Sequence, residues 1–200
     1  MTKFVTSVNR SIGIPNRAGA VLLSSQTASG SSSLDFVSEK DGIDFASYDA
    51  LRFIWVNIGP AEDGTQLTFQ ASTATDPDSP SYNIKITSAP LVAYANEGDS
   101  STFAGYDSSP DQNEGTAYQQ ISRGIGNGAS ESASGEMIVY GIRSAFAKQF
   151  RSVSNLYMNL DFTRMDNIHG YLQTALPLKA FQFKINSGAF DGTIKCYGIL

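Results

Sequence analysis

The stretch LKAFQFKINSGAFDGTIKCYGIL, residues 178–200, carries the pattern that decides the fold class. Over residues 180–185, apolar side chains alternate with glutamine and lysine, which is the period-two pattern of a half-buried strand. Turn-forming residues follow over 186–192, and the alternation restarts over 193–199. The stretch therefore predicts two strands joined by a tight connection, a hairpin that closes the domain at its C-terminal end.

Alternation of the same kind recurs along the chain. It is strongest in residues 51–58, 66–71, 136–142 and 156–162, with shorter strands expected at 20–24, 34–36, 82–86 and 171–176. A Ser/Gly-rich loop is expected at 24–33, and the spacing of 51–58 and 66–71 predicts a hairpin. Trp55, the only tryptophan, is interpreted as a core anchor. About eight to ten short strands without an amphipathic helix indicate an all-β fold, an antiparallel β-sandwich of jelly-roll type.

The length of 200 residues suits one domain. Residues 18–200 are expected to form it, because residues 1–17 show little periodicity and contain Gly13 and Pro15. This first segment is interpreted as an extended N-terminal arm. It is either a loose terminus or a docking arm that contacts a neighbouring subunit.

Composition excludes several classes of function. The net charge is −5 without a basic cluster, which argues against nucleic acid as the partner. A single cysteine, Cys196, allows no internal disulfide and alternates in phase with Ile194 as a buried hydrophobe. No signal peptide and no membrane-inserted segment are expected from the hydropathy pattern.

The sequence offers little for catalysis or metal binding. The single histidine, His169, stands in an expected turn, and Cys196 stands inside an expected strand. The glycines of residues 121–128 are followed by no helix, so a phosphate-binding loop is not expected. Asp76 and Asp78 alone do not complete a calcium site. We therefore expect no catalytic residue, no metal ligand and no cofactor.

Residues 88–120 form the longest stretch without clear periodicity. Long loops in compact domains are usually functional or disordered. The stretch mixes small polar residues with Tyr94, Phe103, Tyr106 and Tyr118, a mixture typical of recognition surfaces. These four aromatic residues are the predicted ligand or receptor contacts, and a plain insertion is the alternative.

The C-terminal stretch also resembles the closing segment of small virion proteins of tailed bacteriophages, particularly those of marine and cyanobacterial phages. Three further motifs carry the resemblance, namely residues 29–36 (SGSSSLDF), 57–63 (NIGPAED) and 124–136, so that it covers roughly residues 29–200. Cys196 departs from the group, which more usually has a large aliphatic residue at this position.

The resemblance implies a non-enzymatic structural protein of the virion, assembled in the host cytoplasm. The implied partners are copies of itself, expected as a homotrimer, and other virion proteins. A tail-fibre component for host attachment would turn residues 88–120 toward a host surface polysaccharide. A capsid decoration (cement) protein, which would clamp the head shell with its N-terminal arm, is the alternative. A glycan hydrolase with two carboxylates is a third hypothesis.

Overall fold

The computed structural model describes residues 19–40 and 42–200, so the predicted N-terminal arm lies outside the described residues. The described residues form strands and no helix, and hence no helix that could cross a membrane. The strands are β1 (Val21–Ser31), β2 (Ser33–Val37), β3 (Ala50–Pro60), β4 (Thr65–Ser72), β5 (Ile86–Asn96), β6 (Thr102–Tyr106), β7 (Gln119–Ile125), β8 (Ala133–Tyr140), β9 (Lys148–Met158), β10 (Phe162–Leu172), β11 (Ala180–Ile185) and β12 (Phe190–Ile199). The all-β prediction is confirmed.

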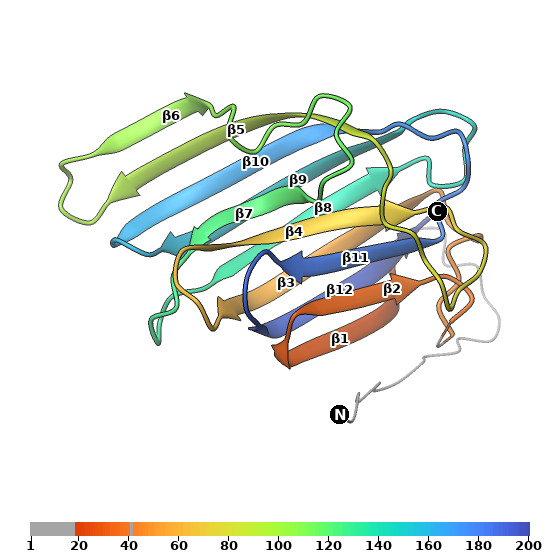
Figure 1. Cartoon of the computed structure of the whole chain (residues 1–200), viewed down its shortest axis with the longest axis horizontal. Coiled ribbons are helices and arrows are strands. Elements are labelled where there is room, and N and C mark those ends of the chain that lie inside the picture. The colour runs from red at the N-terminus through yellow and green to blue at the C-terminus, as the bar shows by residue number, and fades with distance from the viewer. Residues whose placement is uncertain (1–18, 41) are drawn as a thin grey trace.

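All pairings between these strands are antiparallel, and they join the strands into one sheet in the order β1-β12-β3-β8-β9-β7-β4-β11-β2. The sheet curls until its two ends nearly meet, like an almost closed barrel (Figure 1). At the seam, the side chain of Gln26 in β1 donates a hydrogen bond of 2.6 Å to the backbone oxygen of Asp35 in β2. At the opposite junction, β7 meets β9 through one pair, Ile125 and Met158.

Three strands extend the sheet beyond this body. β10 pairs with β9 along its whole length, β5 pairs with β10, and β6 pairs with β5. We call β10, β5 and β6 the wing, which projects at the upper left of Figure 1. One face of the wing continues the inner face of the body, and the other continues its outer face, because directly paired residues share a face.

The core lies between the strands β2, β11, β4 and β7 and the facing strands β12, β3, β8 and β9. Phe53 of β3 lies 4.9 Å from Phe181 and 5.0 Å from Phe183 of β11, measured between ring centroids. Phe69 of β4 lies 5.2 Å from Phe150 of β9. These tilted and edge-to-face contacts stabilise the body beyond the area they bury. Trp55 is fully buried, as its interpretation as a core anchor required.

Both hairpins predicted in the body are wrong, although their strands exist. β11 pairs with β2 and β4, whereas β12 pairs with β1 and β3. Similarly, β3 and β4 pair with other strands and not with each other. Each connection is an arch between opposite walls of the core, and the two arches bind each other: the backbone N–H of Ala61 donates to the oxygen of Ala189 at 2.8 Å.

Three boundaries also differ from the sequence prediction. Residues 24–31 belong to β1 and not to a loop, and residues 81–85 precede β5 instead of forming a strand. The stretch 88–120 is not one long loop, because most of β5, all of β6 and the start of β7 fall within it. Its periodicity is hidden by Pro90, by small residues and by the turn at 97–101. The longest part of this stretch outside the strands is residues 107–118, in which Gly115 forms an isolated antiparallel bridge with Ile86.

Candidate functional site: a polar groove on the outer face

The structure separates the four aromatic residues predicted as contacts. Tyr94 and Phe103 face each other across β5 and β6, with ring centroids 5.5 Å apart and nearly parallel planes. Phe162 of β10 meets Tyr94 edge-on at 5.6 Å, so the wing carries an aromatic cluster on the face that continues the inner face. Tyr106 lies in β6 on the opposite, outer face and is 53% exposed.

Tyr118 lies far from the other three. It precedes β7 and contacts the outer side of β11, where its hydroxyl group donates to Oε1 of Gln182 and Nζ of Lys184 lies 3.8 Å from its ring centroid. Gln182 in turn donates to Asp35 of β2 at 2.9 Å. Tyr118 is therefore held in an internal polar network, and the four residues do not form one contact site.

The residues that share a hollow instead come from the outer face near the end of the wing. Ser134 of β8 pairs with Asn155 of β9, and Tyr157 of β9 pairs with Thr163 of β10. Ala95 of β5 pairs with Thr163 in turn. Because Ala, Ser and Thr side chains are small, neighbouring strands leave a depression beside the tyrosine ring.

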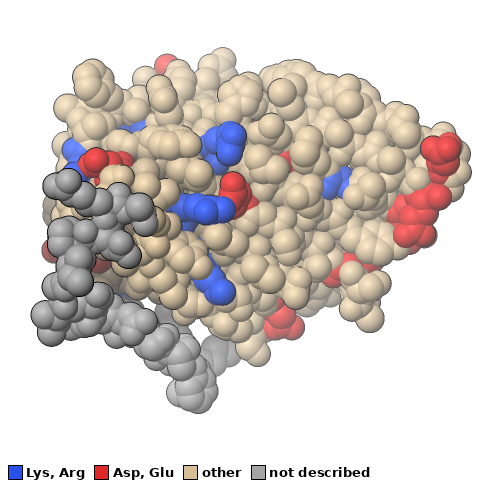
Figure 2. All heavy atoms as spheres, turned by 180° about the vertical axis from the view of Figure 1, so that it is seen from behind, with Lys and Arg blue, Asp and Glu red and all other residues tan. Residues whose placement is uncertain are grey.

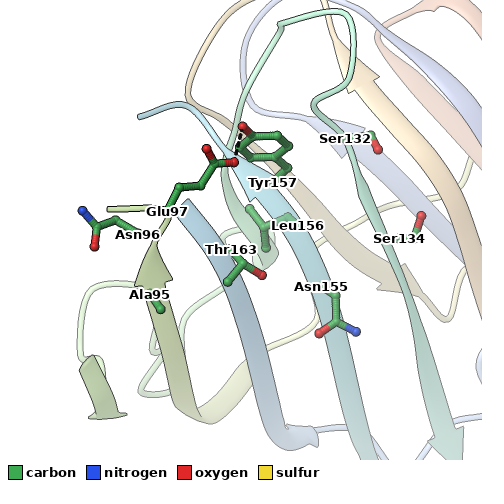
Figure 3. A pocket seen from close by; sticks show the side chains of 9 residues that line it. All are labelled: Ala95, Asn96, Glu97, Ser132, Ser134, Asn155, Leu156, Tyr157 and Thr163. Carbon is green, nitrogen blue, oxygen red and sulfur yellow. Dashed lines mark hydrogen bonds between the residues drawn. The ribbon is translucent and has the colours of Figure 1, made fainter. Parts of the chain in front are cut away.

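We call this depression the Tyr157 groove, which has a volume of about 450 Å³ (Figure 3). It is lined by Ala95, Asn96, Glu97, Ser132, Ser134, Asn155, Leu156, Tyr157 and Thr163. The side chains of Asn155 and Thr163 make no hydrogen bond with any residue in the described ranges 19–40 and 42–200. An amide and a hydroxyl group therefore face the groove with their hydrogen-bonding capacity open to a ligand.

Tyr157 closes one end of the groove through a fixed contact. Its hydroxyl group donates to Oε1 of Glu97 at 2.8 Å and lies 3.3 Å from Oδ1 of Asp161, and Figure 3 shows the bond to Glu97. The hydrogen bond to Glu97, desolvation and the two negative charges raise the pKa of Tyr157 to about 12. The phenol therefore stays protonated at neutral pH and acts as a hydrogen-bond donor and an apolar ring, not as a base.

The turn beside the groove is strained. β9 and β10 are joined by residues 159–161, and both Leu160 (φ 92°) and Asp161 (φ 58°) have positive φ angles. For a bulky side chain such as leucine this conformation is unfavourable, and strained residues cluster at binding sites. Leu160 is also 75% exposed, so an apolar side chain is held out to solvent next to Asp161.

A second polar feature holds the connection between β6 and β7 against the inner face. Asp107 accepts a hydrogen bond of 2.6 Å from Nη1 of Arg123, and Arg164 donates to the buried Asp166 at 2.7 Å. Burial alone would raise the pKa of Asp107, but hydrogen bonds from Ser109 and the guanidinium of Arg123 outweigh it and lower the pKa to about 2. Because each charge has its partner within the network, this cluster has a structural role.

The residues considered for nucleophilic catalysis lie apart. Cys196 is fully buried, and burial raises the pKa of its thiol. His169 is on the outer face of β10, opposite Ala89 and Arg151. Within residues 19–40 and 42–200, no group of three or more His, Cys, Asp or Glu side chains is arranged to hold a metal ion.

Comparisons with models of known protein families, with curated protein sequences and with solved structures found no match. The groove must therefore be interpreted from its own chemistry. Sequence reasoning missed it because its lining residues come from distant segments, between Ala95 and Thr163, and become neighbours only through the register of four strands. The local signal in the sequence was the pair of outward polar residues Asn155 and Tyr157 within the alternating strand.

Proposed function

We propose that this protein is a non-enzymatic structural protein of a tailed-bacteriophage virion, that it serves in host attachment, and that the Tyr157 groove binds a neutral sugar unit of a surface polysaccharide. One observation carries the glycan assignment. The side-chain amide of Asn155 and the hydroxyl group of Thr163, which make no hydrogen bond with the described residues, line the same groove as the ring of Tyr157. The virion assignment is supported by the sequence resemblance, and the jelly-roll sandwich expected with it is part of this proposal.

The chemistry of the groove suits a sugar better than an ion or a lipid. Sugars present hydroxyl groups that both donate and accept hydrogen bonds, and the groove offers an amide, hydroxyl groups and one carboxylate, Glu97. A tyrosine ring adds a flat apolar surface, and tyrosine contributes much contact area at low entropic cost. The groove is open to solvent on the outer face, which lets a repeating polymer enter it from the side.

Glycan binding by the purified full chain tests this assignment. We expect the wild type to bind a glycan on an array or in extracted host polysaccharide. We expect Asn155→Ala and Tyr157→Ala each to weaken this binding about tenfold, because the first loses a hydrogen bond and the second loses a stacking contact. Tyr118→Phe is the matched control, because Tyr118 contacts the far wall. Binding that survives both groove variants, or is lost equally in the control, would assign the ligand site elsewhere.

The alternative is a capsid decoration protein that stabilises the head shell. Its copy number would approach that of the shell protein, whereas a tail-fibre component would be present at far fewer copies. A stained gel of purified particles distinguishes the two.

The glycan-hydrolase hypothesis also gains a specific carboxylate pair, because Glu97 and Asp161 both lie near the hydroxyl group of Tyr157. A polysaccharide cleavage assay with wild type and Glu97→Gln tests it, and unchanged polymer length supports the binding function.

A further inference from the structure

One edge of the sheet is left without a partner at β6. β6 pairs with β5 through one of its edges, and within residues 19–40 and 42–200 no other strand pairs with it. Proteins usually protect such edges with charged residues, proline or a covering segment. The sequence of β6, TFAGY, contains neither a charge nor a proline. An unprotected edge of this kind accepts an additional strand from another chain.

The hydrogen-bonding groups that point away from the wing follow from the register. Asp107 N donates to the oxygen of Pro90, and Asn96 N donates to the oxygen of Ser101. Because antiparallel pairs alternate between hydrogen-bonded and non-hydrogen-bonded, the pair Ala93 and Ala104 is of the second kind. The N–H and C=O of Ala104 therefore point toward the open edge, at the centre of β6.

The surroundings of this edge are acidic. Residues 86–118 contain five acidic residues (Glu97, Asp99, Asp107, Asp111 and Glu114) and neither lysine nor arginine. Asp107 and Glu114 have partners in Arg123 and Lys85, whereas the other three make no ion pair with the described residues. Figure 2 shows acidic side chains at the end of the molecule where the wing lies. Asp99 lies before β6 and Asp111 after it, so both ends of the edge carry negative charge.

The N-terminal segment has the complementary composition. Residues 1–18 contain Lys3, Arg10 and Arg17 and no acidic residue. Between the first two cations stands FVTSV, residues 4–8, which is rich in β-branched and aromatic residues. It matches the five residues of β6 in length, and its flanking cations match the carboxylates at the two ends of the edge.

We infer that residues 3–10 of a neighbouring copy add to the free edge of β6 as a further strand. The same copy is a poorer donor, because seven strand-to-strand steps separate β1 from β6. At about 4.8 Å a step this is at most about 34 Å along the curled sheet, which is close to the full reach of the ten linking residues 11–20. Pairing of β6 with β6 of a second copy would bring two acidic wings together. The inference does not depend on whether the Tyr157 groove binds a glycan.

The oligomeric state of the full-length chain tests the inference, measured by light scattering after size exclusion at about 50 mM and about 500 mM salt. We expect an oligomer at low salt that dissociates at high salt, because screening weakens the attraction between the segment and the wing. Ala104→Pro removes the outward N–H and should raise the dissociation constant about tenfold or more. Ala104→Val keeps that N–H and should leave assembly unchanged. A labelled peptide of residues 1–18 should compete with assembly.

Three results would overturn the inference. The first is a full-length chain that stays monomeric at high concentration and low salt. The second is an oligomer that is unaffected by Ala104→Pro while circular dichroism shows an intact fold. The third is an association that strengthens with salt, which would indicate pairing between two copies of β6. Replacement of both Lys3 and Arg10 by serine provides an independent test, and we expect it to reduce assembly without changing the thermal stability of the chain.

Discussion

The carboxylate of Asp107 accepts a hydrogen bond of 2.6 Å from Nη1 of Arg123, and the same oxygen lies 3.4 Å from Nη2 of Arg164. This contact joins the connection after β6 to β7 and β10. We expect Asp107→Asn to lower the free energy of unfolding by about 1–3 kcal/mol, because two guanidinium groups lose a charged acceptor. Urea unfolding of both proteins at neutral pH measures the difference. The control is Asp99→Asn, in an exposed turn, which should change little.

The same contact predicts a pH dependence. The pKa of Asp107 is lowered to about 2 in the folded protein, from an ordinary value of 3.8. The stabilisation is therefore fully present above the unfolded pKa and is lost as the pH falls from about 4 toward 2. The advantage of wild type over Asp107→Asn should shrink across this window in urea titrations at several pH values. A constant difference between pH 7 and pH 2 would show that the charge of Asp107 is not the cause.

Close approach between strands makes Gly135 intolerant of a side chain. A Cβ atom at this position would lie 2.3 Å from the backbone oxygen of Val153 and 2.7 Å from Cζ2 of Trp55. We expect Gly135→Ala to cost about 2–4 kcal/mol, since β8, β9 and the Trp55 ring must shift. Gly59→Ala in β3, where a Cβ meets nothing within 4 Å, should cost far less. Thermal unfolding of both variants provides the comparison.

The strained turn beside the Tyr157 groove predicts a stabilising substitution. Leu160 has φ of 92° and is 75% exposed, so glycine relieves the backbone strain while little buried contact is lost. We expect Leu160→Gly to raise the free energy of unfolding by about 1 kcal/mol. Leu176→Gly, at another exposed leucine without a positive φ angle, should be neutral or destabilising. If Leu160→Gly destabilises as much as the control, strain at this turn is refuted.

A buried lysine stabilises the turns at one end of the body. Nζ of Lys148 donates to the backbone oxygens of Ser144 at 2.6 Å, Phe146 at 2.8 Å and Thr174 at 3.0 Å. Lys148→Met leaves these acceptors without their donor, and we expect a loss of about 1–3 kcal/mol. Lys85→Met, at an exposed lysine, should lose less than about 1 kcal/mol. Chemical denaturation of the two variants measures both.

Local pattern was enough to predict the fold class but not the pairing of strands. The alternation of Phe181, Phe183 and Ile185 indicates which side chains are buried, and all three are buried. It does not indicate which strand lies alongside. The four residues between β11 and β12 suit a hairpin as well as an arch, and the choice depends on distant partners such as β2 and β1.

The candidate site was predictable only in part. Tyr94, Phe103 and Tyr106 were predicted as ligand contacts from composition, and this stays a prediction; the structure places them on two faces of the wing. The groove itself depends on the register between β8, β9, β10 and β5, which no single segment encodes. That Tyr118 lies apart from the other three could not be foreseen, because its contacts with Gln182 and Lys184 come from residues more than 60 positions away in sequence.

The proposed virion membership can be measured by quantitative mass spectrometry of phage particles purified from a lysate in which this chain is expressed. We expect the chain to copurify with infectious particles in several copies each, at a constant ratio to the shell protein across the density gradient. A chain that is abundant in the infected cell and absent from the particles would contradict it.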